Sequence, residues 1–331
     1  MLRYYHAVAT SLLIILSLNL SAQEKNVEKS ASAVTPVKQI KLLAIGNSFS
    51  GNTTKYLNDI VKSSGNCELV FGHAMIGGCP LERHWNLACK NDANPEDPEG
   101  KPYSYKGKKL GLREMLMAEK WQYVTIQQYS LISYKVETYR PFAKNLYDYI
   151  KKYAPDAEVV VHQTWAYRSD DKDLYKEGFN AVKMYQQLME AYYTIAKELG
   201  CRVIPVGSAF QLAYESPEWE FKTDPDFDYA NPKYPDLPKQ LHSLNVGYSW
   251  KTTGETRKLG VDTHHANSAG EYLGGCVWFE FLFREDARKI KFKPEKIPED
   301  DAAFLRNIAH KVVSDKAKPK AATLEQSNNE H

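Results

Sequence analysis

Short apolar segments alternate with amphipathic segments over the first two thirds of the chain. The segment at 42–45 is a continuous apolar run, too short for a buried helix, and it suits a strand covered on both faces. The amphipathic segments have helical spacing, most regularly over 179–199, where Gly200 ends the pattern. Further strand-like segments occur at 68–75, 121–128, 158–162 and 202–206. Five short strands alternating with helices predict an α/β domain with a mostly parallel sheet and helices on both faces.

Two stretches interrupt this alternation. Residues 82–109 form a polar insertion with prolines, glycines and aromatic side chains, and residues 216–259 combine five prolines with many aromatic residues. A long segment without periodicity inside a domain is usually functional or disordered, and the aromatic density favours an ordered flap over the sheet edge. A helix through Leu273 and Phe281, capped by Asn267 or Ser268, and a last helix at 301–313 complete a single domain over 39–314.

The two ends of the chain have a different character. Residues 1–22 combine Arg3, an apolar centre and a small-residue cleavage site, which is the pattern of a signal peptide. The apolar part is too short for a good membrane span. We expect a flexible leader at 23–38 and a disordered tail at 315–331. The mature protein is therefore expected in the periplasm or outside the cell, with no integral membrane span.

The amino-acid composition bears on which ligands and partners the protein could bind. The 331 residues carry a net charge of +2 and no basic run with interleaved aromatics, which argues against a nucleic-acid partner. The 22 tyrosines and six tryptophans supply flat amphipathic surfaces of the kind found in sugar-binding clefts, cores and interfaces. The five cysteines match no zinc pattern, and either a Cys79–Cys89 disulfide or buried free thiols fit them.

The candidate chemistry lies at Gly46-Asn47-Ser48, directly after the first strand. Ser48 is either a nucleophile at the carboxyl edge of the sheet or the hydroxyl of an ordinary capping turn. Late in the chain, Asp262 and His265 have the spacing that lets a carboxylate orient an imidazole as general base. The adjacent histidines suggest a metal only weakly, because consecutive side chains rarely point the same way, and we expect no metal or cofactor.

These features occur together in a known group of enzymes. The chain resembles the SGNH hydrolase superfamily, also called GDSL-like esterases, and more narrowly the bacterial group DUF4886. The resembling stretches are 44–50, 76–85, 121–128 and 262–273. Together they span roughly residues 40 to 285, and their order along matching elements makes the resemblance fairly specific.

The resemblance implies a three-layer α/β/α flavodoxin-like fold and assigns roles to particular residues. Ser48 falls on the nucleophile, His265 on the general base and Asp262 on its orienting acid. The Ser48 and Gly78 amides fall on the oxyanion hole, with Gly77 as a one-residue alternative to Gly78. The third block departs from the family, because Gln127 and Gln128 stand where the superfamily usually has Gly-x-Asn-Asp.

The glutamines and several nearby side chains are therefore less securely assigned. We expect Gln128 to supply the missing oxyanion amide, with Gln127 as the next candidate, although both could instead satisfy loop backbone groups. Further substrate contacts are expected from Gln127, Gln163, Trp165, Arg83 and His84, although Trp165 fits a core position equally well. Arg168 is a third cationic candidate for an acidic sugar.

The resulting functional prediction is an exported serine esterase that hydrolyses a carbohydrate ester, either an O-acetyl group or a uronate methyl ester. The alternative is a non-catalytic glycan-binding protein on the same scaffold, and the altered third block is the feature that motivates it.

Overall fold

The computed structural model describes residues 37–314. The predicted signal peptide, nearly all of the leader and the tail at 315–331 lie outside this range. From Lys38 onward the described residues form one compact unit. Lys38, expected as the last residue of the leader, is instead the first residue of strand β1.

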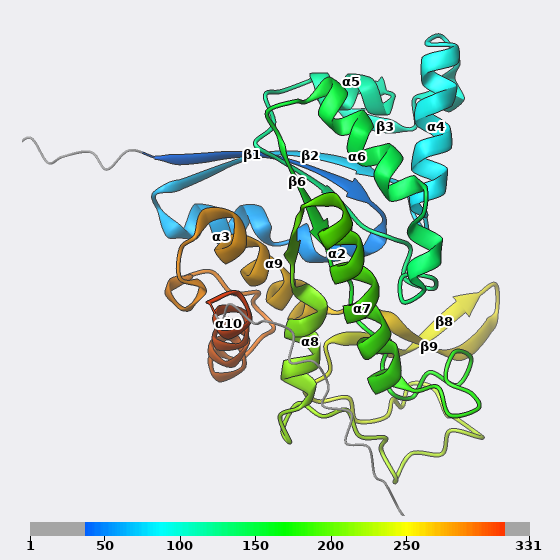
Figure 1. Ribbon diagram of the computed structural model, residues 1–331. Helices are drawn as coiled ribbons and strands as arrows, with labels where there is room; N and C mark the ends of the chain where they lie inside the picture. The colour runs from blue at the N-terminus through cyan, green and yellow to red at the C-terminus, as the bar shows by residue number, and fades with distance from the viewer. Residues whose placement is uncertain (1–36, 315–331) are drawn as a thin grey trace, which may run out of the picture. The chain divides into compact units, whose positions relative to one another are not determined.

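A five-stranded parallel sheet lies at the centre of this unit (Figure 1). Its strand order is β2-β1-β5-β6-β7, which is the order of flavodoxin-like folds. The strands are β1 Lys38–Gly46, β2 Cys67–Met75, β5 Tyr123–Ile126, β6 Glu158–His162 and β7 Arg202–Ile204. The predicted fold class is therefore confirmed.

Helices cover both faces of the sheet, as the strand pattern predicts (Figure 1). The α5, α6 and α7 group lies on one face, and α3 and α9 lie on the other, where α8 and α10 pack against α9. The α-helices are α2 Ser48–Thr54, α3 Leu57–Ser64, α4 Leu81–Ala93, α5 Leu112–Met117, α6 Phe142–Tyr153, α7 Ala181–Leu199, α8 Val206–Tyr214, α9 Ser268–Phe283 and α10 Glu299–Ser314. Short 3-10 turns occur at η1 Pro98–Gly100, η2 Val136–Tyr139 and η3 Ala287–Lys289.

The first insertion is more regular than the sequence suggests. Residues expected as a polar loop form helix α4 and the small hairpin of β3 Tyr103–Tyr105 and β4 Lys108–Leu110. Helix α4 turns Leu81, His84, Ala88 and Asn91 toward the interior, a helical spacing that two polar members disguise. Helix α8 was likewise not predicted.

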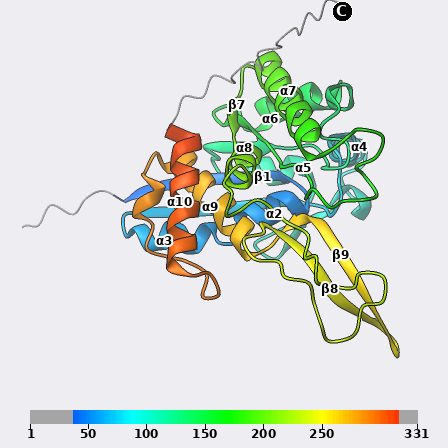
Figure 2. The same cartoon turned by 90° about the horizontal axis from the view of Figure 1, so that it is seen from below.

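The second insertion is a long loop followed by a hairpin. Strands β8 Asn245–Thr253 and β9 Thr256–Ala266 pair antiparallel and project away from the sheet (Figure 2). Residues 260–265, which carry Asp262 and His265, are therefore the end of strand β9. Asn267 caps α9 by accepting from the Ala269 and Gly270 N–H groups, as one of the two capping expectations stated.

Two further expectations concern the cysteines and the membrane. All five cysteines are free thiols, so the Cys79–Cys89 disulfide is absent, and Cys89 is exposed. Within residues 37–314 no helix combines the length and the apolar character needed to cross a membrane.

Buried neutral histidines make the fold sensitive to acid. Burial lowers the pKa of His84 to about 4 and the pKa of His162 to about 3. Below pH 6.5 the unfolded chain therefore binds protons that the folded chain does not, so stability falls as the pH drops from about 6.5 toward 4.

We expect each of these two histidines to contribute roughly 3 kcal/mol to this acid destabilisation, measured by urea unfolding at several pH values. In the variant His162→Phe the free energy of unfolding should fall less steeply over the same pH range, because unfolding then takes up about one proton fewer. An unchanged pH slope in this variant would contradict a neutral buried His162.

Candidate active site

The turn after β1 is held by the side chain of Asn47. Its Oδ1 accepts from the Phe49 N–H at 3.1 Å, which caps α2, and its Nδ2 donates to the Cys79 carbonyl at 3.1 Å. Asn47 is 1% exposed, so these are buried bonds in a low dielectric. They place Ser48 at the first position of α2, beside the carboxyl end of β1.

Ser48, His265 and Asp262 form a continuous chain of hydrogen bonds. The Ser48 Oγ lies 2.9 Å from His265 Nε2, and His265 Nδ1 lies 2.9 Å from Asp262 Oδ2. Because a carboxylate can only accept, Nδ1 carries the proton and Nε2 is free to accept from the serine hydroxyl. The structure thus brings together three side chains from opposite ends of the chain in the arrangement that activates a serine.

Asp262 is fixed by its own strand end. Its Oδ1 accepts from the backbone N–H of His265 at 2.9 Å and of His264 at 3.2 Å. Partial burial acts to raise the pKa of Asp262, but the hydrogen bonds from the His265 ring and backbone outweigh it and hold the pKa well below its usual range. At neutral pH Asp262 is therefore a carboxylate, which can stabilise a positive charge on the neighbouring imidazole.

His264 occupies a different position from its neighbour. Its Nδ1 lies 3.3 Å from Asp262 Oδ1, and its ring centroid lies 5.1 Å from that of Tyr167. Burial lowers the pKa of His264 despite the nearby carboxylate. Asp262, His264 and His265 offer three ligand atoms within 4.8 Å of one another, so they could hold a metal. A metal there would compete for the His265 nitrogens that contact Ser48 and Asp262.

Backbone amides are available for an oxyanion after both β1 and β2. Among residues 37–314, no hydrogen-bond partner is found for the N–H groups of Ser48, Gly78 and its alternative Gly77. Gly78 has φ +60 in the turn after β2, a conformation that favours glycine, and it is exposed. The Tyr129 ring lies beside it, 3.8 Å from where a Cβ would be.

Neither glutamine of the third block is free to bind an oxyanion, which corrects the expectation for Gln128. Gln128 is fully buried; its Oε1 accepts from the Leu81 and Tyr129 N–H groups, and its Nε2 donates to the Thr138 carbonyl at 2.9 Å. Gln127 is also buried, and its Nε2 donates to Asn47 Oδ1 at 2.8 Å. Both side chains therefore support the turns around the site.

Three other predicted substrate contacts also lie inside the protein. His84 is fully buried, with Nε2 donating to the Gly46 carbonyl at 3.1 Å and Nδ1 accepting from Tyr103 at 2.8 Å. Gln163 is fully buried and accepts from the N–H and the hydroxyl of Ser208. The Gln163 Nε2 donates to Met189 Sδ at 2.9 Å, so both side chains are buried and hydrogen-bonded within the protein.

Trp165 is a core residue beneath the site. It is fully buried, its ring stacks on Phe49 at 4.3 Å and on Phe210 at 4.4 Å, and its Nε1 donates to the His264 carbonyl at 2.9 Å. It therefore holds the strand end that carries His265. Of the predicted substrate contacts, Arg83 alone is exposed.

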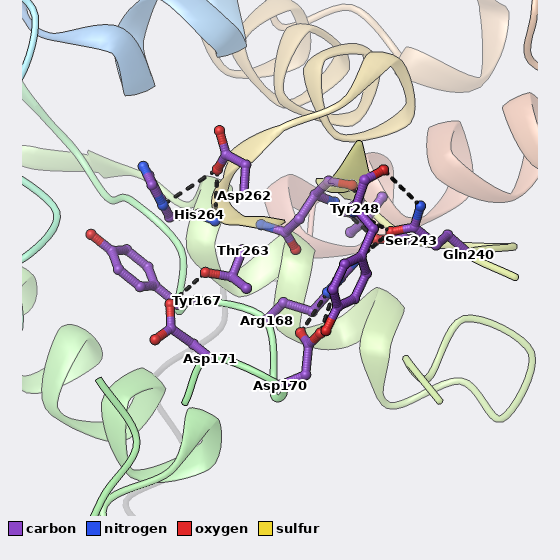
Figure 3. Close-up of polar contacts among 12 residues, drawn as sticks. Tyr167, Arg168, Asp170, Asp171, Gln240, Ser243, Tyr248, Asp262, Thr263 and His264 are labelled. Atoms are coloured by element: carbon purple, nitrogen blue, oxygen red, sulfur yellow. Dashed lines mark hydrogen bonds and ion pairs between the residues drawn. The ribbon is translucent and has the colours of Figure 1, made fainter. Parts of the chain in front are cut away.

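Two tyrosines near the site, each following the end of a strand, were not predicted from the sequence. Tyr129 lies beside Gly78, and Tyr167 donates to or accepts from Ser130 Oγ at 2.9 Å while its ring faces His264 (Figure 3). Their position after β5 and β6 is the signal that could have found them, because ligands bind at the carboxyl ends of parallel strands.

The Asn47 bonds give a stability prediction. The variant Asn47→Ala leaves the Phe49 N–H and the Cys79 carbonyl without a partner and removes one of the two acceptors of Gln127 Nε2. We expect it to lower the free energy of unfolding by about 2 kcal/mol. Asn47→Ser keeps a side-chain oxygen that can accept from the Phe49 N–H at the N-cap, so it should cost less. Urea unfolding of both variants measures this, and equal losses would contradict the role of the cap.

More than half of the chain matches the model of one protein family. Residues 41–227 match DUF4886, a domain of unknown function. This range contains Ser48 and Gly78 and ends before Asp262 and His265. No curated protein matches the chain.

The chain is also similar to proteins of known structure. A DUF4886 family protein from Bacteroides uniformis ATCC 8492 shares 26% identity, covers 84% of this chain and 95% of its own, and has a TM-score of 0.62. A protein from Slackia heliotrinireducens, provisionally assigned as an SGNH hydrolase, shares 20% identity over 73% of this chain and 98% of its own, with a TM-score of 0.44. A lipase/acylhydrolase from Enterococcus faecalis shares 14% identity over 54% of this chain and 83% of its own, with a TM-score of 0.36.

Proposed function

The chain belongs to the DUF4886 family, and from that premise we propose that it is a serine esterase in which Ser48 is the nucleophile. The observation that carries this proposal is the hydrogen-bonded series Ser48–His265–Asp262, with 2.9 Å at each step. A hydroxyl, a neutral imidazole and a carboxylate in this order are what acyl transfer from an ester requires.

The first half of the reaction forms an acyl-enzyme. Ser48 Oγ attacks the ester carbonyl carbon while its proton passes to His265 Nε2. The carbonyl oxygen becomes an oxyanion, and the N–H groups of Ser48 and Gly78 donate to it. When the tetrahedral intermediate collapses, the bond to the alcohol oxygen breaks and His265 gives its proton to the leaving alkoxide.

The second half releases the acid. A water molecule attacks the acyl carbon, His265 takes its proton, and the bond to Ser48 Oγ breaks as the same proton returns to the serine. Asp262 stays ionised throughout and stabilises the imidazolium. With Gln128 engaged elsewhere, two backbone donors hold the oxyanion, and the loss of one side-chain donor typically costs about 10²–10³ in turnover. We therefore expect a slow enzyme of its class.

The substrate we propose is a carbohydrate ester, carrying an O-acetyl or a uronate methyl ester group. The predicted signal peptide supports an exported enzyme in the periplasm or outside the cell, where polysaccharides are found. For the uronate, two of the three cationic contacts expected from the sequence, His84 and Arg168, are buried and engaged within the protein.

The alternative is a glycan-binding protein without catalysis, and the occupied glutamines of the third block favour it. The hydrogen-bonded triad side chains favour the esterase, because a binding protein has no need for an imidazole held between a hydroxyl and a carboxylate. Covalent labelling separates the two.

A fluorophosphonate probe should label the protein at a single residue, because such probes react with activated serines. We expect labelling to vanish in Ser48→Ala and to survive in Ser50→Ala, whose hydroxyl is buried and bonded to the Asn47 carbonyl. Mass spectrometry of the labelled peptide identifies the site. A well-folded protein that does not react at Ser48 would overturn the proposal.

The two adjacent histidines provide a second test. His265→Ala removes the imidazole bonded to Ser48 and should reduce kcat for a 4-nitrophenyl ester by about 10³-fold or more. His264→Ala leaves the Ser48–His265–Asp262 chain in place and should cost about tenfold or less. Equal losses in the two variants would show that the base is assigned to the wrong residue.

A further inference from the structure

A pocket next to His264 lies between the loop at 170–173 and the β8–β9 hairpin. It has a volume of about 640 Å³, and Thr263 and His264 are among its lining residues. This volume is typical of small-molecule sites. Figure 3 shows Asp170, Asp171 and Tyr248 beside Thr263 and His264.

The pocket ends close to the proposed catalytic base. The ring centroid of His264 lies 4.2 Å from that of His265. A molecule in the pocket that contacts His264 is therefore one ring away from the imidazole bonded to Ser48. Pocket and triad meet on consecutive residues of β9.

The wall of the pocket is held by a buried arginine. The guanidinium of Arg168 binds Asp170 through two hydrogen bonds of 2.7 and 2.9 Å and stacks on Phe221 at 3.9 Å. Its backbone N–H donates to the Thr263 carbonyl at 2.8 Å, and Asp171 accepts from the Thr263 hydroxyl. The loop is thus fastened to β9, so the pocket is formed before any ligand arrives.

The lining combines aromatic and charged groups. Tyr229, Tyr248 and Trp250 supply flat surfaces, and exposed Lys172, Arg257 and Lys258 stand around them. Burial raises the pKa of Tyr248 to about 12, so its hydroxyl keeps its proton at neutral pH. A lipid chain would bury these charged groups without hydrogen bonds, which is unfavourable.

A sugar ring fits this combination of groups. The C–H face of a pyranose packs on an aromatic ring, and its hydroxyls both donate and accept hydrogen bonds with charged and phenolic side chains. We propose that the pocket between residues 170–173 and the β8–β9 hairpin is a saccharide subsite that holds the sugar part of the substrate beside His264. This inference rests on the proposed function and adds to it the place and the chemistry of substrate recognition.

Binding to an inactive protein tests the subsite without relying on catalysis. The full chain carrying Ser48→Ala is titrated by calorimetry with three unesterified probes: xylohexaose, cellohexaose and hexagalacturonate. We expect saturable binding of at least one probe. Adding Trp250→Ala should weaken that binding about tenfold, because it removes an aromatic face.

A matched aromatic variant serves as the control. Tyr134 lines a separate pocket of about 470 Å³ that includes none of the triad residues, so Tyr134→Ala should change the affinity less than twofold. If Trp250→Ala does not fold, the exposed pair Arg257→Gln and Lys258→Gln replaces it, and this pair should weaken binding several-fold. Thermal unfolding establishes which variants are folded.

The outcomes separate the two proposals. Binding that Trp250→Ala weakens and Tyr134→Ala spares supports the subsite. Absence of binding to all three probes by folded Ser48→Ala protein, or equal losses in the two aromatic variants, overturns it. Failure of the esterase proposal would be seen separately, as wild-type protein that the fluorophosphonate does not label at Ser48.

Discussion

The position of Ser48 depends on the buried hydrogen bonds beneath the turn at Gly46 and Asn47. Gly46 accepts from His84, and Asn47 bonds to Phe49, Cys79 and Gln127 through its side chain and to Ser50 through its carbonyl. A Cβ at Gly46 would lie 2.8 Å from Ser50 Oγ and 2.9 Å from Gln127 Cγ, so only glycine fits there. Each of these polar groups is out of water, and leaving one unpaired costs more than the bond itself contributes. The turn is therefore determined by its surroundings, and the serine hydroxyl at its tip remains free for His265.

This constraint explains why several residues expected to bind substrate have a structural role instead. His84, Gln127 and Gln128 have the side chains of a binding site, and they stand at the carboxyl edge of the sheet as the sequence indicates. The sequence places a residue at that edge but not the direction of its side chain. In the structure these side chains turn inward, where they satisfy polar groups of neighbouring turns, while Gly78 is exposed and Tyr129 lies half-buried beside it.

The sequence predicts the fold correctly in elements whose buried residues are apolar and regularly spaced. Strand β1 and helix α7 bury apolar residues at regular spacing, so their patterns are visible in the sequence. The same holds for the Asp262 and His265 spacing, since both residues lie on one short segment. Helix α4 was missed because two of its four buried residues are His84 and Asn91, which read as polar. The β8–β9 hairpin was missed because it projects from the body and most of its residues are partly or fully exposed, so no alternation of burial marks it.

The hairpin couples the triad to the pocket. Asp262 on β9 pairs with Gly247 on β8, where the register shifts, and bulges of this kind redirect side chains. Gly247 has φ +75, and a Cβ there would lie 2.0 Å from Gln240 Oε1 and 2.5 Å from Arg168 Nη1. The residue opposite the triad carboxylate is thus packed against the arginine that fastens the pocket wall. Two residues further along each strand from this pairing, Ser249 pairs with Gly260, and Trp250 pairs with Leu259 at the pocket. A displacement of the hairpin would move the pocket and Asp262 together, so the strand that carries the proposed base His265 would also determine where a bound sugar lies relative to Ser48.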